Sequence, residues 1–170
     1  MIFLSMIIMI TLKILNTKSK YQENRNQILS MPEFDFISVN NTDSIKKQMH
    51  NTHVIIINYF NTNCDFCRHE IRDIISYQDL FKNMCILLIS DQSIDTLKKF
   101  NETIKMDSFP SINICKVDYL SFTDKFGNVL PPTTFMYDSN KRLIKKYKGQ
   151  IRAPVMANDI KEYYNPINNQ

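Results

Sequence analysis

Residues 64–67 read Cys64-Asp65-Phe66-Cys67, and they lie between an apolar run, Val54–Phe60, and a stretch with helical spacing. Two cysteines three positions apart at the first turn of a helix can close into a disulfide and reopen. Unpaired backbone N–H groups and the helix dipole favour negative charge at that place, so the first thiol ionises more readily. We therefore expect Cys64 to be a nucleophile and Cys67 to resolve the mixed disulfide that forms on it.

Zinc binding, haem attachment and an inert pair are the competing interpretations of this spacing. A zinc site needs two further ligands at suitable spacing, whereas Cys85 and Cys115 stand alone in predicted core strands. Haem attachment needs a histidine directly after the second cysteine, but Arg68 separates Cys67 from His69. A CxxC beside alternating strands and helices favours redox chemistry, and we expect neither a metal nor an organic cofactor.

Apolar periodicity predicts strands and helices in alternation. The predicted strands are 33–39, 53–60, 85–90, 109–117, 133–137 and 142–148, and the predicted helices are 43–48, 64–81, 93–104, 119–126 and 153–164. We expect Asn61–Asn63 to supply the N-cap of the second helix. The alternation favours an α/β fold: a parallel sheet between helices, with an antiparallel hairpin at one edge.

The first residues form a segment of their own. The apolar run Ile2–Leu12 would span only about 16 Å as a helix, against about 30 Å for the hydrocarbon core of a bilayer. It fits the apolar region of a signal peptide better than a full span, although the usual positive flank and cleavage site are missing. We predict a signal or anchor segment with a polar linker (Lys18–Asn26) at 1–27, a folded domain at 28–165 and a polar tail at 166–170. The alternative is a buried N-terminal helix or strand.

The net charge of +4 is mild, and the basic residues are spread along the chain, so we do not expect nucleic-acid binding. Cys85 and Cys115 are expected to be buried free thiols that pack as small apolar residues. A disulfide between them is the alternative in an exported protein.

A second motif, Pro131-Pro132-Thr133-Thr134-Phe135, makes the interpretation more specific. The segment Ile57–Glu70 resembles the active-site segment of thioredoxin-like proteins of the TlpA/ResA type, and Leu130–Asp138 resembles that family's cis-proline segment. Gly149 matches a glycine that is common after the last strand, and the resemblance covers about Met31–Tyr164. It implies a thioredoxin-like central sheet with flanking helices and an antiparallel C-terminal hairpin.

The resemblance also implies roles for single residues. Pro132 would be the cis-proline, packed against the Cys64 sulfur, and Pro131, Pro132 and Thr133 would bind the substrate peptide. A proline at 131 lacks the N–H donor that is more usual at that position, which removes part of that contact. Glu70 corresponds to a helix glutamate that related reductases use near their thiols. It would relay protons for Cys67, or else it is an ordinary solvated helix residue.

Three positions depart from the family pattern. Asn58 stands where thioredoxins often carry a buried aspartate, and Asn63 replaces the tryptophan that usually precedes the first cysteine. Asp65 places a negative charge between the thiols, which favours the protonated thiol and hence a reductant over a strong oxidant.

The resulting prediction is a thiol–disulfide oxidoreductase, more a reductant than an oxidant, that acts on protein cysteines through a mixed disulfide. We expect a monomer that is exported to the periplasm or anchored in the membrane facing it. Its electrons would come from a membrane-linked donor. The alternative is a redox-inactive thioredoxin-fold domain that binds a partner in an exported complex.

Overall fold

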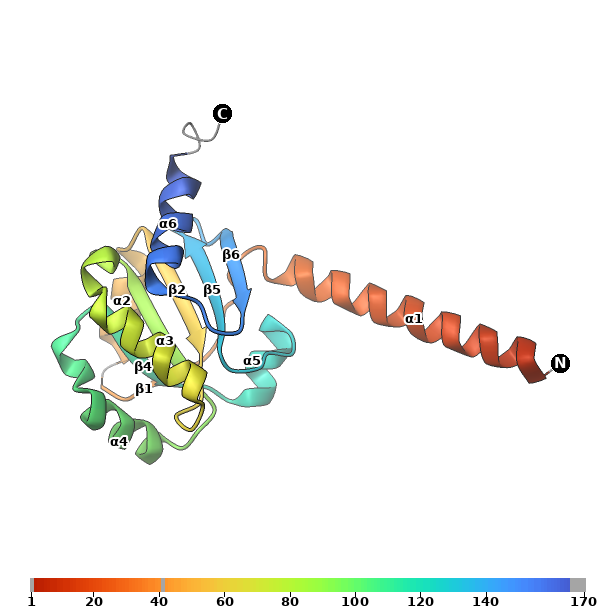
Figure 1. The fold of residues 1–170 in the computed structure, drawn as a ribbon, viewed down its shortest axis with the longest axis horizontal. Coiled ribbons are helices and arrows are strands. Elements are labelled where there is room, and N and C mark those ends of the chain that lie inside the picture. Colours follow the sequence, from red (N-terminus) through yellow and green to blue (C-terminus); the bar gives the residue numbers. More distant parts are fainter. Residues whose placement is uncertain (1, 41, 166–170) are drawn as a thin grey trace.

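A six-stranded mixed sheet forms the centre of the structure, a computed structural model that describes residues 2–40 and 42–165 (Figure 1). The strands lie in the order β1-β4-β3-β2-β5-β6. Their bounds are β1 Ile37–Ser38, β2 Val54–Tyr59, β3 Cys85–Ser90, β4 Ile112–Lys116, β5 Thr133–Asp138 and β6 Leu143–Lys148. Strands β2, β3 and β4 are parallel, whereas β5 and β6 form an antiparallel hairpin beside β2, and β1 pairs antiparallel with β4. The predicted α/β fold is confirmed.

Helices cover both faces of this sheet. One face packs against α3 (Asp65–Ser76), α4 (Ile94–Ile104) and α6 (Ala153–Tyr164), and the other against α2 (Thr42–His50) and α5 (Tyr119–Phe126). Short 3-10 turns lie at Gln78–Phe81 and Met106–Ser108.

Strand β2 serves both hydrophobic cores because its side chains alternate between the two faces. Val54 and Ile56 belong to the core under α3, whereas Ile55 and Ile57 belong to the core under α5. All six residues of β2 are buried, as the continuous apolar run predicted for a central strand. The chain therefore leaves β2 from the middle of the sheet.

The predicted strand at 109–117 is shorter in the structure, where β4 is Ile112–Lys116, and two other elements of the domain also differ. The strand predicted at 33–39 shrinks to the two residues of β1, although its side chains still alternate in burial, and the ring of Phe34 packs edge-on against Phe122 and Phe126. The helix predicted at 64–81 ends at Ser76, where the Tyr77 N–H donates back to Asp73 and Ile75, and a 3-10 turn follows. Tertiary packing, rather than periodicity, sets these boundaries.

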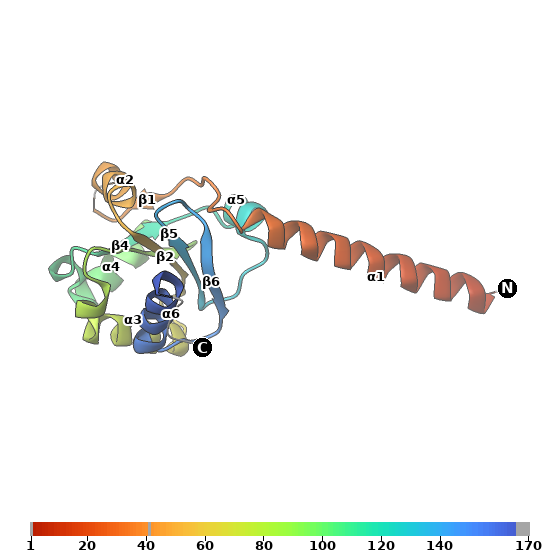
Figure 2. The same ribbon diagram turned by 90° about the horizontal axis from the view of Figure 1, so that it is seen from above.

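The N-terminal helix α1 (Ile2–Gln27) stands away from the domain (Figures 1 and 2). The stretch Lys18–Asn26, predicted as a polar linker, is helical: it holds no glycine or proline, and α1 continues through it. The alternative of a buried helix or strand is wrong, since Met6, Met9 and Leu12 are each more than half exposed. Among the described residues, none of the helices combines the length and the apolar character that crossing a membrane requires. The tail predicted at 166–170 lies outside the described residues.

Truncation of a side chain in β2 tests the two-sided core. Ile56 is 0% exposed, and Ile56→Ala should lower the free energy of unfolding by about 3 kcal/mol through lost burial and a cavity. The matched change Ile37→Ala, at a residue that is 61% exposed, should cost less than about 1 kcal/mol. Urea unfolding followed by circular dichroism measures both values, and equal losses would contradict the assigned core.

Candidate active site

The CxxC motif lies where the chain leaves β2 and enters α3. The N-cap of α3 is Cys64 itself, with φ −87° and ψ 116°, and its Sγ accepts a hydrogen bond from the Cys67 backbone N–H at 3.3 Å. The N-cap predicted at Asn61–Asn63 is therefore wrong by one residue, because the sulfur takes the acceptor role that a polar side chain usually fills. A backbone N–H and the positive end of the helix both stabilise negative charge on that sulfur.

The two sulfurs have unequal surroundings. Cys64 is half-buried and Cys67 is fully buried. Burial, together with the neighbouring Cys64 and Glu70, raises the pKa of Cys67 to about 12. An outside disulfide can therefore reach Cys64, whereas Cys67 keeps its proton until a base takes it.

Gln92, just beyond the end of β3, holds the loop that precedes Cys64. Its Oε1 accepts from the Thr62 backbone N–H at 2.8 Å, and its Nε2 donates to the Thr62 hydroxyl at 3.0 Å. An Arg68 guanidinium nitrogen donates to the Thr62 carbonyl oxygen at 3.2 Å. No motif in the sequence includes Gln92. Its one signal was position: residues after neighbouring parallel strands meet at the same sheet edge.

Glu70 is a buried carboxylate, 0% exposed. Its Oε1 accepts from Asn58 Nδ2 and from the Thr134 hydroxyl, each at 2.8 Å, and its Oε2 accepts from the Ile151 backbone N–H at 3.1 Å. The alternative of a solvated helix residue is therefore wrong. Burial raises the pKa of Glu70 to about 7, although these three donors each pull it down.

The Asn58 side chain is a donor to Glu70 that also carries a free acceptor. Its Nδ2 donates to Glu70 and also to the Thr134 hydroxyl at 2.8 Å, whereas its Oδ1 is buried without a hydrogen-bond partner. The groups around Glu70 are all donors and suit an ionised carboxylate. A protonated Glu70 needs an acceptor instead, which the Thr134 hydroxyl oxygen, or Oδ1 of Asn58 after rotation of its amide, would supply.

Asp73, one turn after Glu70, fixes the start of the last helix. Its carboxylate accepts from the Ala153 backbone N–H at 2.6 Å and forms an ion pair with Arg152 at 3.0 Å. Two acids of α3 thus hold the chain at 151–153. The sequence analysis gave Asp73 no role, because nothing local shows that α6 returns to α3.

The Pro131–Thr133 segment lies at the same end of the sheet as the CxxC motif. β5 begins opposite the end of β2, with Thr133 paired to Tyr59. The Pro131–Pro132 peptide bond is cis, Pro132 is buried, and its carbonyl oxygen accepts from the Gly149 N–H at 2.9 Å. The structure thus brings Cys64, Cys67, Glu70 and this segment to one end of the sheet.

The remaining cysteines lie in the core. Cys85 and Cys115 are free and 0% exposed, so the alternative of a disulfide between them is wrong, and burial raises the pKa of each to about 12. Within residues 2–40 and 42–165, no group of three or more histidine, cysteine or acidic side chains is placed to hold a metal ion.

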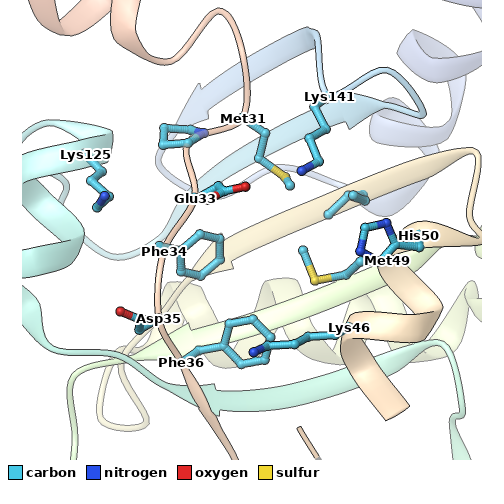
Figure 3. Close-up of a pocket in the computed structure, with 12 residues that line it drawn as sticks. Met31, Glu33, Phe34, Asp35, Phe36, Lys46, Met49, His50, Lys125 and Lys141 are labelled. Carbon is cyan, nitrogen blue, oxygen red and sulfur yellow. The ribbon is translucent and has the colours of Figure 1, made fainter. Parts of the chain in front are cut away.

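A hollow in the structure lies away from the cysteines (Figure 3). It has a volume of about 440 Å³ and reaches Ile55, near the opposite end of β2 from the cysteines. Phe34 lies in its middle, with Lys125 on one side and His50 and Lys141 on the other. It shares no residue with the CxxC motif or the Pro131–Thr133 segment.

Comparison with known proteins supports the fold. No protein-family profile and no curated protein matches the sequence, but solved structures do match. The thiol:disulfide interchange protein of the thioredoxin family from Chlorobium tepidum is 18% identical with a TM-score of 0.61, over 79% of this chain and 94% of that one. The fold is thioredoxin-like.

Two further structures share it. A thiol-disulfide isomerase from Corynebacterium glutamicum is 12% identical with a TM-score of 0.63, over 84% of this chain and 98% of that one. The pneumococcal exposed lipoprotein thioredoxin of Streptococcus pneumoniae is 13% identical with a TM-score of 0.60, over 77% of this chain and 99% of that one. At identities this low the likeness concerns the thioredoxin-like fold, and it agrees with the fold that the sequence resemblance implied.

Alkylation tests the unequal surroundings of the cysteines. In the native protein at neutral pH, iodoacetamide should modify Cys64 first, because Cys67, Cys85 and Cys115 are buried and protonated. In urea all four thiols should react. Mass spectrometry of peptides after a short pulse measures this, and native modification of Cys85 or Cys115 as fast as Cys64 would contradict the structure.

The pH dependence of stability tests Glu70. Its pKa is about 7 in the folded protein, against an ordinary 4.5, so the folded state binds this proton more tightly than the unfolded chain does. The stabilisation is fully present below pH 4.5 and is lost as the pH rises to about 7. Between pH 5 and 8, the loss of this stabilisation should lower the free energy of unfolding of the wild type by about 2–3 kcal/mol.

Glu70→Gln cannot titrate at this position and serves as the comparison. Urea unfolding at several pH values measures the free energy of unfolding of both proteins. The value for the wild type minus the value for Glu70→Gln should fall as the pH rises from 5 to 8. A difference that stays constant from pH 5 to 8 would show that Glu70 titrates near its ordinary value.

Proposed function

We propose that the protein is a thiol–disulfide oxidoreductase that acts on protein cysteines. The observation that carries the proposal is the half-buried Cys64 sulfur at the N-terminus of α3, which accepts the Cys67 N–H, with the Cys67 thiol buried one turn behind it. A CxxC placed in this way has an accessible nucleophile and a shielded second thiol, which are the two parts that disulfide exchange requires.

The reaction follows in two balanced steps. The Cys64 thiolate attacks one sulfur of a substrate disulfide, the substrate S–S bond breaks, and a mixed disulfide forms while the second substrate sulfur leaves as a thiolate. The Cys67 thiolate then attacks the Cys64 sulfur, which releases the first substrate sulfur and leaves a Cys64–Cys67 disulfide. Two electrons pass from the pair to the substrate, and reversal of the steps oxidises a dithiol.

Glu70 is the proposed proton acceptor for Cys67. With a pKa of about 12, Cys67 needs a base before it can attack, and Glu70, with a pKa of about 7, is partly ionised at neutral pH. Glu70 follows Cys67 by three residues in α3, hence on the same side of the helix. Proton transfer runs directly or through one water molecule.

Reduction is the proposed direction. Burial and the negative charge of Glu70 disfavour a thiolate on Cys67, and the less a reduced pair can stabilise a thiolate, the poorer an oxidant its disulfide is. The sequence analysis based this direction on Asp65 alone. Asp65 forms an ion pair with Arg68, which offsets its charge, so Cys67 and Glu70 are the stronger support.

The proposed substrate contact includes Pro131, Pro132 and Thr133. Pro131 is half-buried and offers a carbonyl but no N–H, and the preceding Leu130 is 75% exposed. Phe66, which lies between the two cysteines in the sequence, is 64% exposed. It supplies an aromatic surface where Asn63 lacks one, and the two apolar side chains suit a peptide segment around the substrate cysteine.

We also infer that the protein works outside the cytoplasm, attached to a membrane through α1, where a membrane-linked partner would return electrons to the Cys64–Cys67 disulfide. The exposed apolar side chains between Met6 and Leu15 support this inference. So does the shared fold of the pneumococcal exposed lipoprotein thioredoxin.

Insulin reduction by dithiothreitol tests the activity. The wild type should accelerate the reduction, and Cys64→Ser should fall to the rate of dithiothreitol alone, because the attacking sulfur is gone. Cys67→Ser should leave covalent adducts on Cys64, which a non-reducing gel displays. Cys85→Ala, which removes a buried thiol elsewhere, should keep the activity. Equal rates for the wild type and Cys64→Ser would favour the partner-binding alternative.

A further inference from the structure

A second, smaller groove begins beside the nucleophile and runs between α3 and α4. Its volume is about 330 Å³, and it starts at Thr62 and Asp65, the residues that lie close to Cys64 on either side in the sequence. It continues along α3 past Arg68 to Arg72. A substrate held at Cys64 can therefore extend into this groove.

Of the two arginines that line the groove, one forms no ion pair within the described residues, and His69 also lines it. Asp65 and Arg68 form an ion pair with each other, and Arg68 also donates to the Thr62 carbonyl oxygen, so these two charges are used within the site. Arg72 lies on the same side of α3 about one turn later and is exposed. In the part of the chain that the structure describes, no carboxylate forms an ion pair with it.

Part of the groove wall is apolar, although Thr103 and His69 add polar groups to the lining. Phe100 and Ile104 of α4 are half-buried and pack against the core, and Ile71 of α3 is buried beneath them. A free guanidinium above an apolar wall matches a short peptide segment that has both an apolar side chain and a carboxylate.

Geometry sets where that carboxylate must lie. Arg72 follows Cys64 by about two turns of α3, which is about 12 Å at 1.5 Å per residue. An extended peptide covers this length with three to four residues at about 3.3 Å each. We propose that this groove selects substrates that carry an aspartate or glutamate three to four residues from the reactive cysteine. The inference rests on the proposed disulfide exchange at Cys64 and adds a substrate class to it.

Charge-matched substrates test the inference on the full chain. Disulfide-linked fluorescent peptides would differ only in having glutamate, glutamine or lysine three residues from the cysteine, with a second set at four residues and sets on either side of the cysteine. For one of these placements, kcat/KM in low salt should be about threefold higher for glutamate than for glutamine, the scale of an exposed ion pair. The preference should vanish in about 0.5 M salt, because salt screens exposed charges.

Arg72→Glu should reverse the order, so that the lysine peptide is reduced fastest while the glutamine peptide keeps its rate. Lys161→Glu makes the same change of net charge on α6, one turn before Tyr164, whose hydroxyl donates to the His53 carbonyl oxygen at the far end of β2. It should leave the order of the wild type unchanged.

Three results would overturn the inference. If the three peptides are reduced at equal rates at every placement, or if Arg72→Glu and Lys161→Glu have the same effect, the groove does not select substrates, and the exchange chemistry at Cys64 stands. If no peptide is reduced beyond the rate of Cys64→Ser, the proposed function itself fails and the substrate class fails with it. Thermal unfolding of each variant verifies that the exposed substitutions leave the fold intact.

Discussion

A single buried carboxylate ties the helix that carries the cysteines to the rest of the protein. Glu70 of α3 accepts hydrogen bonds from Asn58 in β2, Thr134 in β5 and Ile151 before α6. A buried carboxylate without these hydrogen bonds would lower the free energy of unfolding by about 3 kcal/mol or more. The fold therefore needs the three donors as long as Glu70 is ionised. Because the same carboxylate lies one turn after Cys67, its protonation state links the packing of α3 to the chemistry of the thiols.

This arrangement explains how a thioredoxin-like sheet keeps two neighbouring sulfurs different. Cys64 lies in the last position before the helix, where a backbone N–H points at its sulfur, and Cys67 lies in the first turn, where the core buries it. Burial is the largest cause of the difference, since it raises the pKa of Cys67 more than the neighbouring Glu70 does. The positions of the two sulfurs depend on where β2 ends and α3 begins. Gln92 fixes the loop between these two elements through its hydrogen bonds to Thr62.

The features with a local cause were predictable from the sequence. The run Val54–Phe60 has the continuous apolar character of a strand buried on both faces, and the breaker residues after it place the cysteines at a helix start. The partners of Glu70 were not predictable, because Asn58, Thr134 and Ile151 meet only in the folded sheet. The apolar N-terminal run was recognisable as unusual, but its periodicity alone did not show that the polar residues after it would extend the same helix.

The C-terminal helix α6 supports the helix that Cys64 caps. Asp73 binds the Ala153 N–H and the Arg152 guanidinium, so the start of α6 is fastened to the helix whose first turn carries the cysteines. A chain cut before residue 151 would lose both anchors of α3 on that side, and Glu70 would face solvent. The pKa of Glu70 therefore depends on an intact C-terminal helix α6.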